Sequence, residues 1–176
     1  DSQGREVDTV KADDFVAGMQ HMCDAQGGLE YMVQGVIKNV SQYISGEVTD
    51  FDEVGVKAVD DYTVEYTLEE PCSYFMTMLG YNVFAPMSRS YYESKGGKFG
   101  ADFDNSAASY TYGKTPSDIA YCGPYQVSNF TSENTIVFTA NPAYWNKDNI
   151  TIKTLTWLYN DGQDALKPYN DTISGV

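Results

Sequence analysis

Two stretches of this chain alternate apolar and polar residues, and each is interrupted by turn-forming residues. In residues 54–68, "VGVKAVDDYTVEYTL", the pair Asp60-Asp61 separates two runs. In residues 123–142, "GPYQVSNFTSENTIVFTANP", the segment "TSEN" separates two more, between a Gly-Pro and an Asn-Pro pair. A period of two places the apolar side chains of a strand on one face and its polar side chains in water. The sequence therefore predicts two antiparallel hairpins.

Apolar residues at helical spacing precede the first hairpin. Residues 10–23 place five apolar side chains on one face of a helix: Val10, Phe15, Met19, Met22 and Cys23. Asp13 and Asp14 fall in its first turn, where negative charge suits the helix dipole. Residues 29–44 repeat apolar side chains at spacings of three and four, and Gly46 follows as a stop. We expect amphipathic helices over both ranges.

The rest of the chain predicts shorter elements. They are a helix at 72–79, a strand or extended segment at 81–87, a helix capped by Ser88 and ending near Lys95, a strand at 150–159, and a weak helix from about Gln163 that Pro168 interrupts. Residues 96–120 lack any period and form the longest loop, a kind that tends to be functional or mobile. The expected fold class is α+β, with a small antiparallel or mixed sheet and flanking helices.

Composition excludes several classes of protein. The chain has 176 residues, 42% of them hydrophobic, so it can bury a core. Its 25 acidic residues exceed its 11 basic residues and give a formal charge of −14, which repels nucleic-acid phosphates. No run approaches the ~20 apolar residues that a transmembrane helix needs. We therefore predict no nucleic-acid partner.

The three cysteines do not suggest a metal site. Cys23, Cys72 and Cys122 lie about 50 residues apart, whereas zinc ligands come in close pairs. We expect three small buried apolar side chains, and the sequence leaves open a Cys23–Cys72 disulfide.

Catalytic groups are scarce. The only histidine, His21, lies within the first helix, where we expect a surface or partly buried side chain rather than a general base. Acidic residues recur in five groups: Asp13/Asp14, Asp50/Asp52/Glu53, Asp60/Asp61, Glu69/Glu70 and Asp102/Asp104. Each group falls in a turn, a loop or a helix start, where acidic residues are common. We predict no catalytic residue, no metal and no cofactor.

Tyrosine is the richer signal. Fifteen tyrosines occur, and four of them surround the long loop and the second hairpin: Tyr110, Tyr112, Tyr121 and Tyr125. Tyrosine offers flat contact area and a polar tip, which suits peptide or sugar recognition, and it also suits the rim of a core.

Four blocks of sequence resemble the extracytoplasmic solute-binding proteins of peptide ABC transporters (family 5). They are "VKADDFVAGMQHMCD", "GVKAVDDYTVEYTLEEPCSYFMTML", "APMSRSYYESKG" and "CGPYQVSNFTSENTIVFTANPAYWN". The blocks follow the family's order and spacing over residues 10 to about 165. Lys11 departs from the family's Thr or Ser at the helix start, so capping is expected from Thr9 or from charge. In "CGPYQVSNFTSENTIVFTANPAYWN", Tyr144-Trp145 is expected to anchor the chain to the core.

The resemblance implies the two-lobed fold of type II periplasmic binding proteins, with this chain as a fragment of the first lobe. Residues 1–149 would form its inserted subdomain, and 150–176 a strand and short helix returning toward the main lobe. The implied function is capture of oligopeptides outside the cell and delivery to the membrane permease subunits, with the second lobe completing the pocket. The protein would be a membrane-anchored lipoprotein or periplasmic. Carried over by position, the ligand-binding residues are Tyr31, Tyr81 and Asn82.

Two other classes remain open from the residues alone. Facing carboxylates or clustered tyrosines would suit a glycoside hydrolase fragment or a carbohydrate-binding module. An autonomous adhesion module would need no small ligand.

Overall fold

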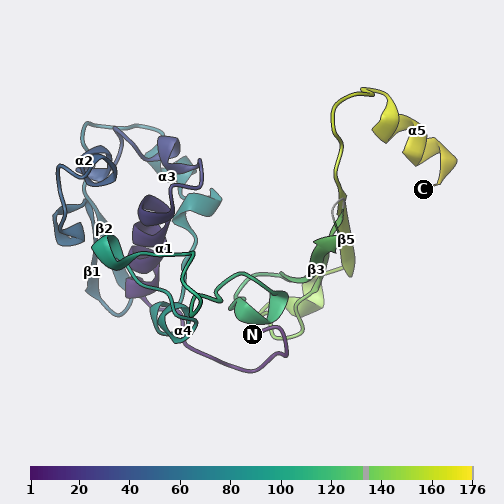
Figure 1. Ribbon diagram of the computed structural model, residues 1–176, viewed down its shortest axis with the longest axis horizontal. Coiled ribbons are helices and arrows are strands. Elements are labelled where there is room, and N and C mark those ends of the chain that lie inside the picture. The colour runs from purple at the N-terminus through teal and green to yellow at the C-terminus, as the bar shows by residue number, and fades with distance from the viewer. Residues whose placement is uncertain (133–134, 176) are drawn as a thin grey trace. The chain divides into compact units, whose positions relative to one another are not determined.

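The computed structural model describes residues 1–132 and 135–175 (Figure 1). The chain divides into two compact units. One, here called the 6–112 unit, is Glu6–Tyr112; the other, here called the 113–176 unit, is Gly113–Val176 together with Asp1–Arg5. The long loop expected at 96–120 thus contains the boundary between the units. The expected division at 149/150, between the inserted subdomain of the first lobe and the strand and helix that return toward the main lobe, stays a prediction.

The first helix of the 6–112 unit, α1 (Ala12–Ala25), confirms the predicted helix at 10–23. The backbone N–H of Lys11 donates to the carboxylate of Asp14 over 2.8 Å, and the other oxygen of this carboxylate accepts from the Arg89 N–H at 3.2 Å. The side chain of Asp14 therefore fixes the start of α1. Of the two expected sources of capping, the charged Asp14 side chain is the one used and Thr9 is not. Val10 lies before the helix with an exposed side chain.

The continuous helix predicted at 29–44 is wrong. A 3₁₀ turn at Glu30–Met32 is followed by turns, and only α2 (Val40–Ser45) is α-helical. Between them Gly35 and Asn39 take left-handed backbone conformations (φ 69° and 62°), and Ile37 forms a β-bridge with Leu68. The spacing correctly marked Val33, Ile37 and Val40 as buried, but pairing with residues 67–69 replaced the helical hydrogen bonds.

The first predicted hairpin is confirmed. Strands β1 (Val56–Asp60) and β2 (Thr63–Tyr66) pair antiparallel, with Val56 opposite Tyr66. The predicted helix at 72–79 shortens to α3 (Phe75–Met78), and the segment at 81–87 contains a 3₁₀ turn at Asn82–Phe84 between extended residues.

The predicted helix after Ser88 is confirmed as α4 (Arg89–Ser94). The Ser88 hydroxyl accepts from the Tyr91 N–H at 3.2 Å, which is the expected cap.

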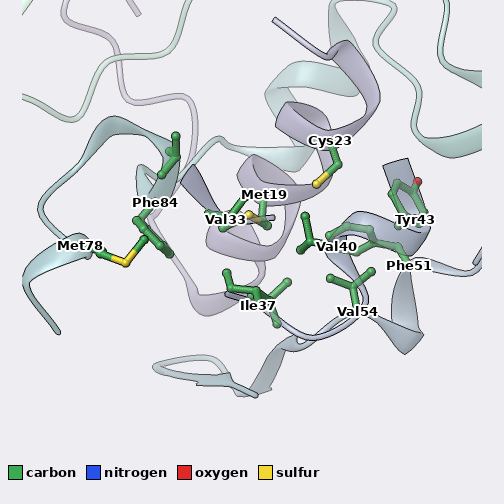
Figure 2. Packing of buried hydrophobic residues seen from close by; sticks show 12 residues of the cluster. Met19, Cys23, Val33, Ile37, Val40, Tyr43, Phe51, Val54, Met78 and Phe84 are labelled. Atoms are coloured by element: carbon green, nitrogen blue, oxygen red, sulfur yellow. The ribbon is translucent and has the colours of Figure 1, made fainter. Parts of the chain in front are cut away.

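Two buried clusters hold the 6–112 unit together, and α1 contributes to both. The first cluster joins α1, the 33–40 turns, α2, the hairpin and the 78–84 segment (Figure 2). Its buried members are Met19, Cys23, Val33, Ile37, Val40, Tyr43, Phe51, Val54, Val56, Met78, Val83 and Phe84. The second cluster contains Ala17, Met87, Tyr92 and Tyr110, so the beginning of the predicted long loop is packed rather than free.

The 113–176 unit is built on the second predicted hairpin, which is confirmed. Strands β3 (Tyr125–Ser132), β4 (Thr135–Ala140) and β5 (Thr154–Leu158) form one antiparallel sheet in that order. In the expected "TSEN" turn, Glu133 and Asn134 lie outside the described residues. Pairing of Ile136 with Trp157 and of Phe138 with Leu155 places these apolar side chains on one face of the sheet.

Asn141 locks the end of the second hairpin. Its side chain is buried, and its Nδ2 donates to the Gly123 carbonyl at 2.9 Å. Its Oδ1 accepts from Gln126 and from the Ala143 N–H, both at 3.0 Å. The prediction that Tyr144-Trp145 anchors the chain to the core is wrong for Trp145, whose side chain is 83% exposed.

The last helix, α5 (Lys167–Ser174), corrects the prediction for Pro168. Pro168 stands in the first turn, where the missing N–H has no helical partner to lose, so the proline is part of the helix start and does not interrupt the helix.

The cysteines are unpaired in the structure, so the Cys23–Cys72 disulfide left open by the sequence is not formed. Cys23 is buried as expected, and burial raises the pKa of its thiol to about 12. Cys72 is half-buried, and Cys122 is exposed, so the expectation of three buried thiols holds fully only for Cys23.

Candidate ligand-binding site

Tyr31 lies on the 3₁₀ turn Glu30–Met32 with its side chain 69% exposed. The turn is fixed at its start by the Glu30 carboxylate, which accepts the Gly28 N–H at 2.8 Å. It is fixed at its end by Val33, which is buried in the first cluster. The local structure therefore holds the Tyr31 ring in solvent while its neighbour anchors the chain.

Tyr81 and Asn82 are presented in the same way. The Tyr81 N–H donates to the Met78 carbonyl at 2.9 Å, and the Tyr81 carbonyl accepts from the Phe84 N–H at 3.0 Å. Phe84 is buried in the first cluster, whereas the Tyr81 side chain is 56% exposed and Asn82 is exposed. Within the described chain, neither the Tyr31 nor the Tyr81 hydroxyl makes a side-chain hydrogen bond.

The structure thus places the three predicted residues on segments that share one core. Val33, Met78 and Phe84 belong to the same cluster (Figure 2). Which of the predicted residues contacts a ligand is not tested by this arrangement, and the assignment stays a prediction.

Sequence reasoning missed further exposed apolar side chains on the 74–81 segment. Met76 is 75% exposed, and Tyr74 and Leu79 are also exposed, while Phe75 and Met78 turn inward. The exposure of Met76 could have been predicted from the spacing of three between Phe75 and Met78. This spacing places both side chains on the face of the short helix that packs on the core and leaves Met76 on another face.

The strongest candidate for acid–base chemistry has a structural role instead. Asp24 lines a cavity of about 270 Å³ beside Tyr43 and Gly100, and burial raises the pKa of its carboxyl. Both carboxylate oxygens are occupied: one accepts from the Tyr43 hydroxyl and the other from the Gly100 N–H, each at 2.8 Å. Asp24 therefore ties α1 to α2 and to the 100–102 turn.

The acidic groups named from the sequence also make local contacts. Asp13 pairs with Arg89 at 2.6 Å, Asp50 caps a 3₁₀ turn, and Asp60 closes the β1–β2 turn through the Tyr62 N–H. Among the described residues, no group of three His, Cys, Asp or Glu side chains could hold a metal ion. No described helix is long and apolar enough to cross a membrane.

Solved structures define the class of protein. The substrate-binding domain of an oligopeptide ABC transporter from Bacillus anthracis matches 96% of this chain with a TM-score of 0.71 and 27% identity. OppA from Burkholderia pseudomallei matches 94% with a TM-score of 0.72 and 26% identity. In each case the chain covers 30% of the solved protein. The fold is that of one part of a two-lobed periplasmic binding protein, in the α+β class expected.

Sequence comparison gives the family. The model described as bacterial extracellular solute-binding proteins, family 5, matches residues 4–169. The oligopeptide-binding protein SarA of Streptococcus gordonii is 38% identical over 99% of this chain, and AliA of Streptococcus pneumoniae is 36% identical over 99%. The chain belongs to family 5 of the bacterial extracellular solute-binding proteins. It spans about a quarter of the length of these relatives.

These comparisons give no support to a glycoside hydrolase or a carbohydrate-binding module.

Proposed function

We propose that this chain is part of the substrate-binding component of an ABC importer that captures oligopeptides outside the cell and delivers them to the permease subunits. The observation that carries the proposal is the family match over residues 4–169. The occupied carboxylates of Asp13, Asp24 and Asp60 add support for a role without catalysis. Because relatives are described as extracellular or periplasmic, the full-length protein is proposed to act there, as a membrane-anchored lipoprotein or free in the periplasm.

The pocket is proposed to be divided between this chain and a second lobe of the same protein. Two-lobed binders hold a ligand by hinge closure, so one lobe alone leaves half of the ligand in water. Tyr31, Tyr81 and Asn82 are the proposed contacts on this side, since their side chains are exposed over a rigid core. Exposed tyrosines suit peptides because they combine apolar area with a hydroxyl group.

The first test compares this chain with the full-length protein. Native mass spectrometry of the full-length protein purified from its host would identify the retained ligand. Residues 1–176 alone should bind that ligand only at ~1 mM or not at all, because half of the proposed contacts are absent. Calorimetric titration of both proteins with the same ligand measures this difference. Binding by residues 1–176 with a Kd below ~1 μM would overturn the divided pocket, and a retained ligand that is not a peptide would overturn the oligopeptide proposal.

The second test concerns the assigned residues. In the full-length protein, Tyr31→Ala and Tyr81→Ala should each weaken binding about tenfold, and Asn82→Ala somewhat less, because buried interface tyrosines dominate binding energy. Tyr62→Ala is the matched control, since the Tyr62 side chain is 86% exposed at the β1–β2 turn and is not assigned to the site. Affinities that stay unchanged in all three variants would remove these residues from the site, whatever the ligand.

A further inference from the structure

His21 sits in an aromatic cage formed by residues from two other parts of the 6–112 unit. Its ring centroid lies 4.8 Å from that of Tyr92 on α4. It lies 5.9 Å from Phe103 and 6.1 Å from Tyr112, which belong to the segment after α4. The cage therefore joins α1 to α4 and to residues 99–112, here called the 99–112 segment.

One nitrogen of His21 has no partner. Nδ1 is buried and is the only buried side-chain nitrogen or oxygen among the described residues without a hydrogen bond. In the neutral imidazole this nitrogen can remain an acceptor without a donor, a modest cost. In the imidazolium both nitrogens carry hydrogen, so the buried Nδ1 would become a charged N–H donor without an acceptor.

The charged groups around the cage do not compensate that charge. On α1, the Asp24 carboxylate is bound to Tyr43 and Gly100. On α4, Arg89 pairs with Asp13 and lies 4.7 Å from the centroid of the Phe99 ring. On the 99–112 segment, Asp102 and Asp104 are exposed, and the Asp104 carboxylate accepts from the N–H and hydroxyl of Ser106. Lys98, just before the segment, is also exposed.

The hydroxyl of Tyr92 in the cage and that of Tyr110, which packs against Tyr92, stay neutral in the acid range. Burial raises the pKa values of both Tyr92 and Tyr110, so neither supplies a negative charge. Burial is also the cause that lowers the pKa of His21 itself, in agreement with the geometry. The attraction of a cation to aromatic faces, about 0.5–2 kcal/mol, favours the imidazolium and so opposes the lowering of the His21 pKa, but it supplies no acceptor for Nδ1.

We propose that His21 is a proton-sensitive latch: uptake of a proton by its imidazole releases the 99–112 segment from α1. The direction of the pH effect follows from the linkage between proton binding and opening. The folded pKa is lower than the unfolded value of about 6.5, so the unfolded or opened state binds more protons as the pH falls below ~6.5. The stabilisation of the 99–112 segment by neutral His21 is complete above that pH and is lost as the pH falls through the folded pKa. The first cluster contains no part of the cage and stays packed.

The chain offers a direct test, because His21 is its only histidine. A proton NMR titration of residues 1–176 between pH 4.5 and 8 follows a single imidazole C2–H signal. We expect its midpoint below ~6.5. Amide hydrogen exchange at pH 7 and pH 5, corrected for intrinsic rates, should show protection falling in the 99–112 segment and unchanged around Val33 and Ile37. Each unit by which the folded pKa of His21 lies below the unfolded pKa allows the opening constant to rise up to about tenfold at low pH.

The control variant is His21→Phe, which keeps a ring and removes the titrating group. Its 99–112 segment should show equal protection at both pH values, and His21→Leu serves if the larger ring disturbs folding. Asp24→Asn tests the neighbouring carboxyl, whose pKa is raised and whose protonation favours the folded state as the pH falls, opposite in sign to His21. A midpoint at or above ~6.5, or the same loss of protection in His21→Phe, would overturn the latch.

Discussion

Replacement of Tyr92 by alanine should destabilise the 6–112 unit by about 3–5 kcal/mol, the usual loss for truncating a buried aromatic side chain. Tyr92 is 0% exposed and is the largest fully buried side chain among the described residues. Its ring lies 4.9 Å from Phe99 and 5.1 Å from Tyr112, measured between centroids. It also covers Gly97, where an added Cβ would overlap the ring. Alanine would therefore leave a cavity that the backbone cannot fill.

Urea unfolding of residues 1–176, followed by far-ultraviolet circular dichroism, measures this loss. Tyr92→Phe separates packing from hydrogen bonding, because it keeps the ring and removes the hydroxyl, which donates to the Lys98 carbonyl at 3.0 Å and also interacts with the Tyr110 side chain. That variant should lose about 1 kcal/mol. Tyr62→Ala, at an exposed position, should change stability by less than about 0.5 kcal/mol. If Tyr92→Ala unfolds at the same urea concentration as Tyr62→Ala, the second cluster is not a core.

Gly55→Ala should be nearly as severe, with a loss of about 3 kcal/mol, because the added methyl group has no space. Gly55 is the junction of three backbone segments. Its N–H donates to the Lys38 carbonyl at 2.9 Å, and its carbonyl accepts from the Thr67 N–H at 2.8 Å. The Lys38 N–H in turn donates to the Thr67 carbonyl at 3.0 Å. A Cβ on Gly55 would overlap the Thr67 carbonyl oxygen, so these bonds would have to lengthen.

Gly27→Ala is the matched control for that variant. Gly27 follows α1, no atom lies within 4 Å of its added Cβ, and its backbone does not require a positive φ. Its stability should stay within about 1 kcal/mol of the parent protein. The same urea measurement serves for both variants. Equal midpoints would mean that the three segments are not held by the Gly55 junction.

The hairpins and α1 were predictable because their signals are local. Alternation in 62–68 and the Asp60-Asp61 pair specify β1 and β2 without reference to the rest of the chain. The cap of α4 at Ser88 is equally local. For the candidate site, exposure of Tyr31 and Tyr81 could not be read from composition. Their assignment came from resemblance to a family and remains a proposal.

The prediction of a helix over 29–44 failed because hydrogen bonds to a distant segment replaced local ones. The helical spacing of 29–44 indicates several of the side chains that are buried, yet the Lys38 N–H donates to the Thr67 carbonyl and the Val36 carbonyl accepts from the Glu69 N–H, instead of bonding to helical partners. The sequence marked Asn141 only as the end of a strand. Its side-chain bonds to Gly123 and Gln126 exist only in the folded hairpin and could not be predicted.

By itself the sequence determined the α+β class, the two hairpins, several of the buried apolar positions such as Met19, Val33, Ile37 and Val40, and the resemblance to family 5. These properties depend on period, turn residues and motif order, all of which can be read along the chain. Only the tertiary structure decided that Ile37 joins a β-bridge, that the start of the 96–120 loop is packed, and that His21 lies in a cage with an unpartnered nitrogen. The physical reason is that hydrogen-bond partners and burial are set by residues far away in sequence, and a linear pattern carries no record of them.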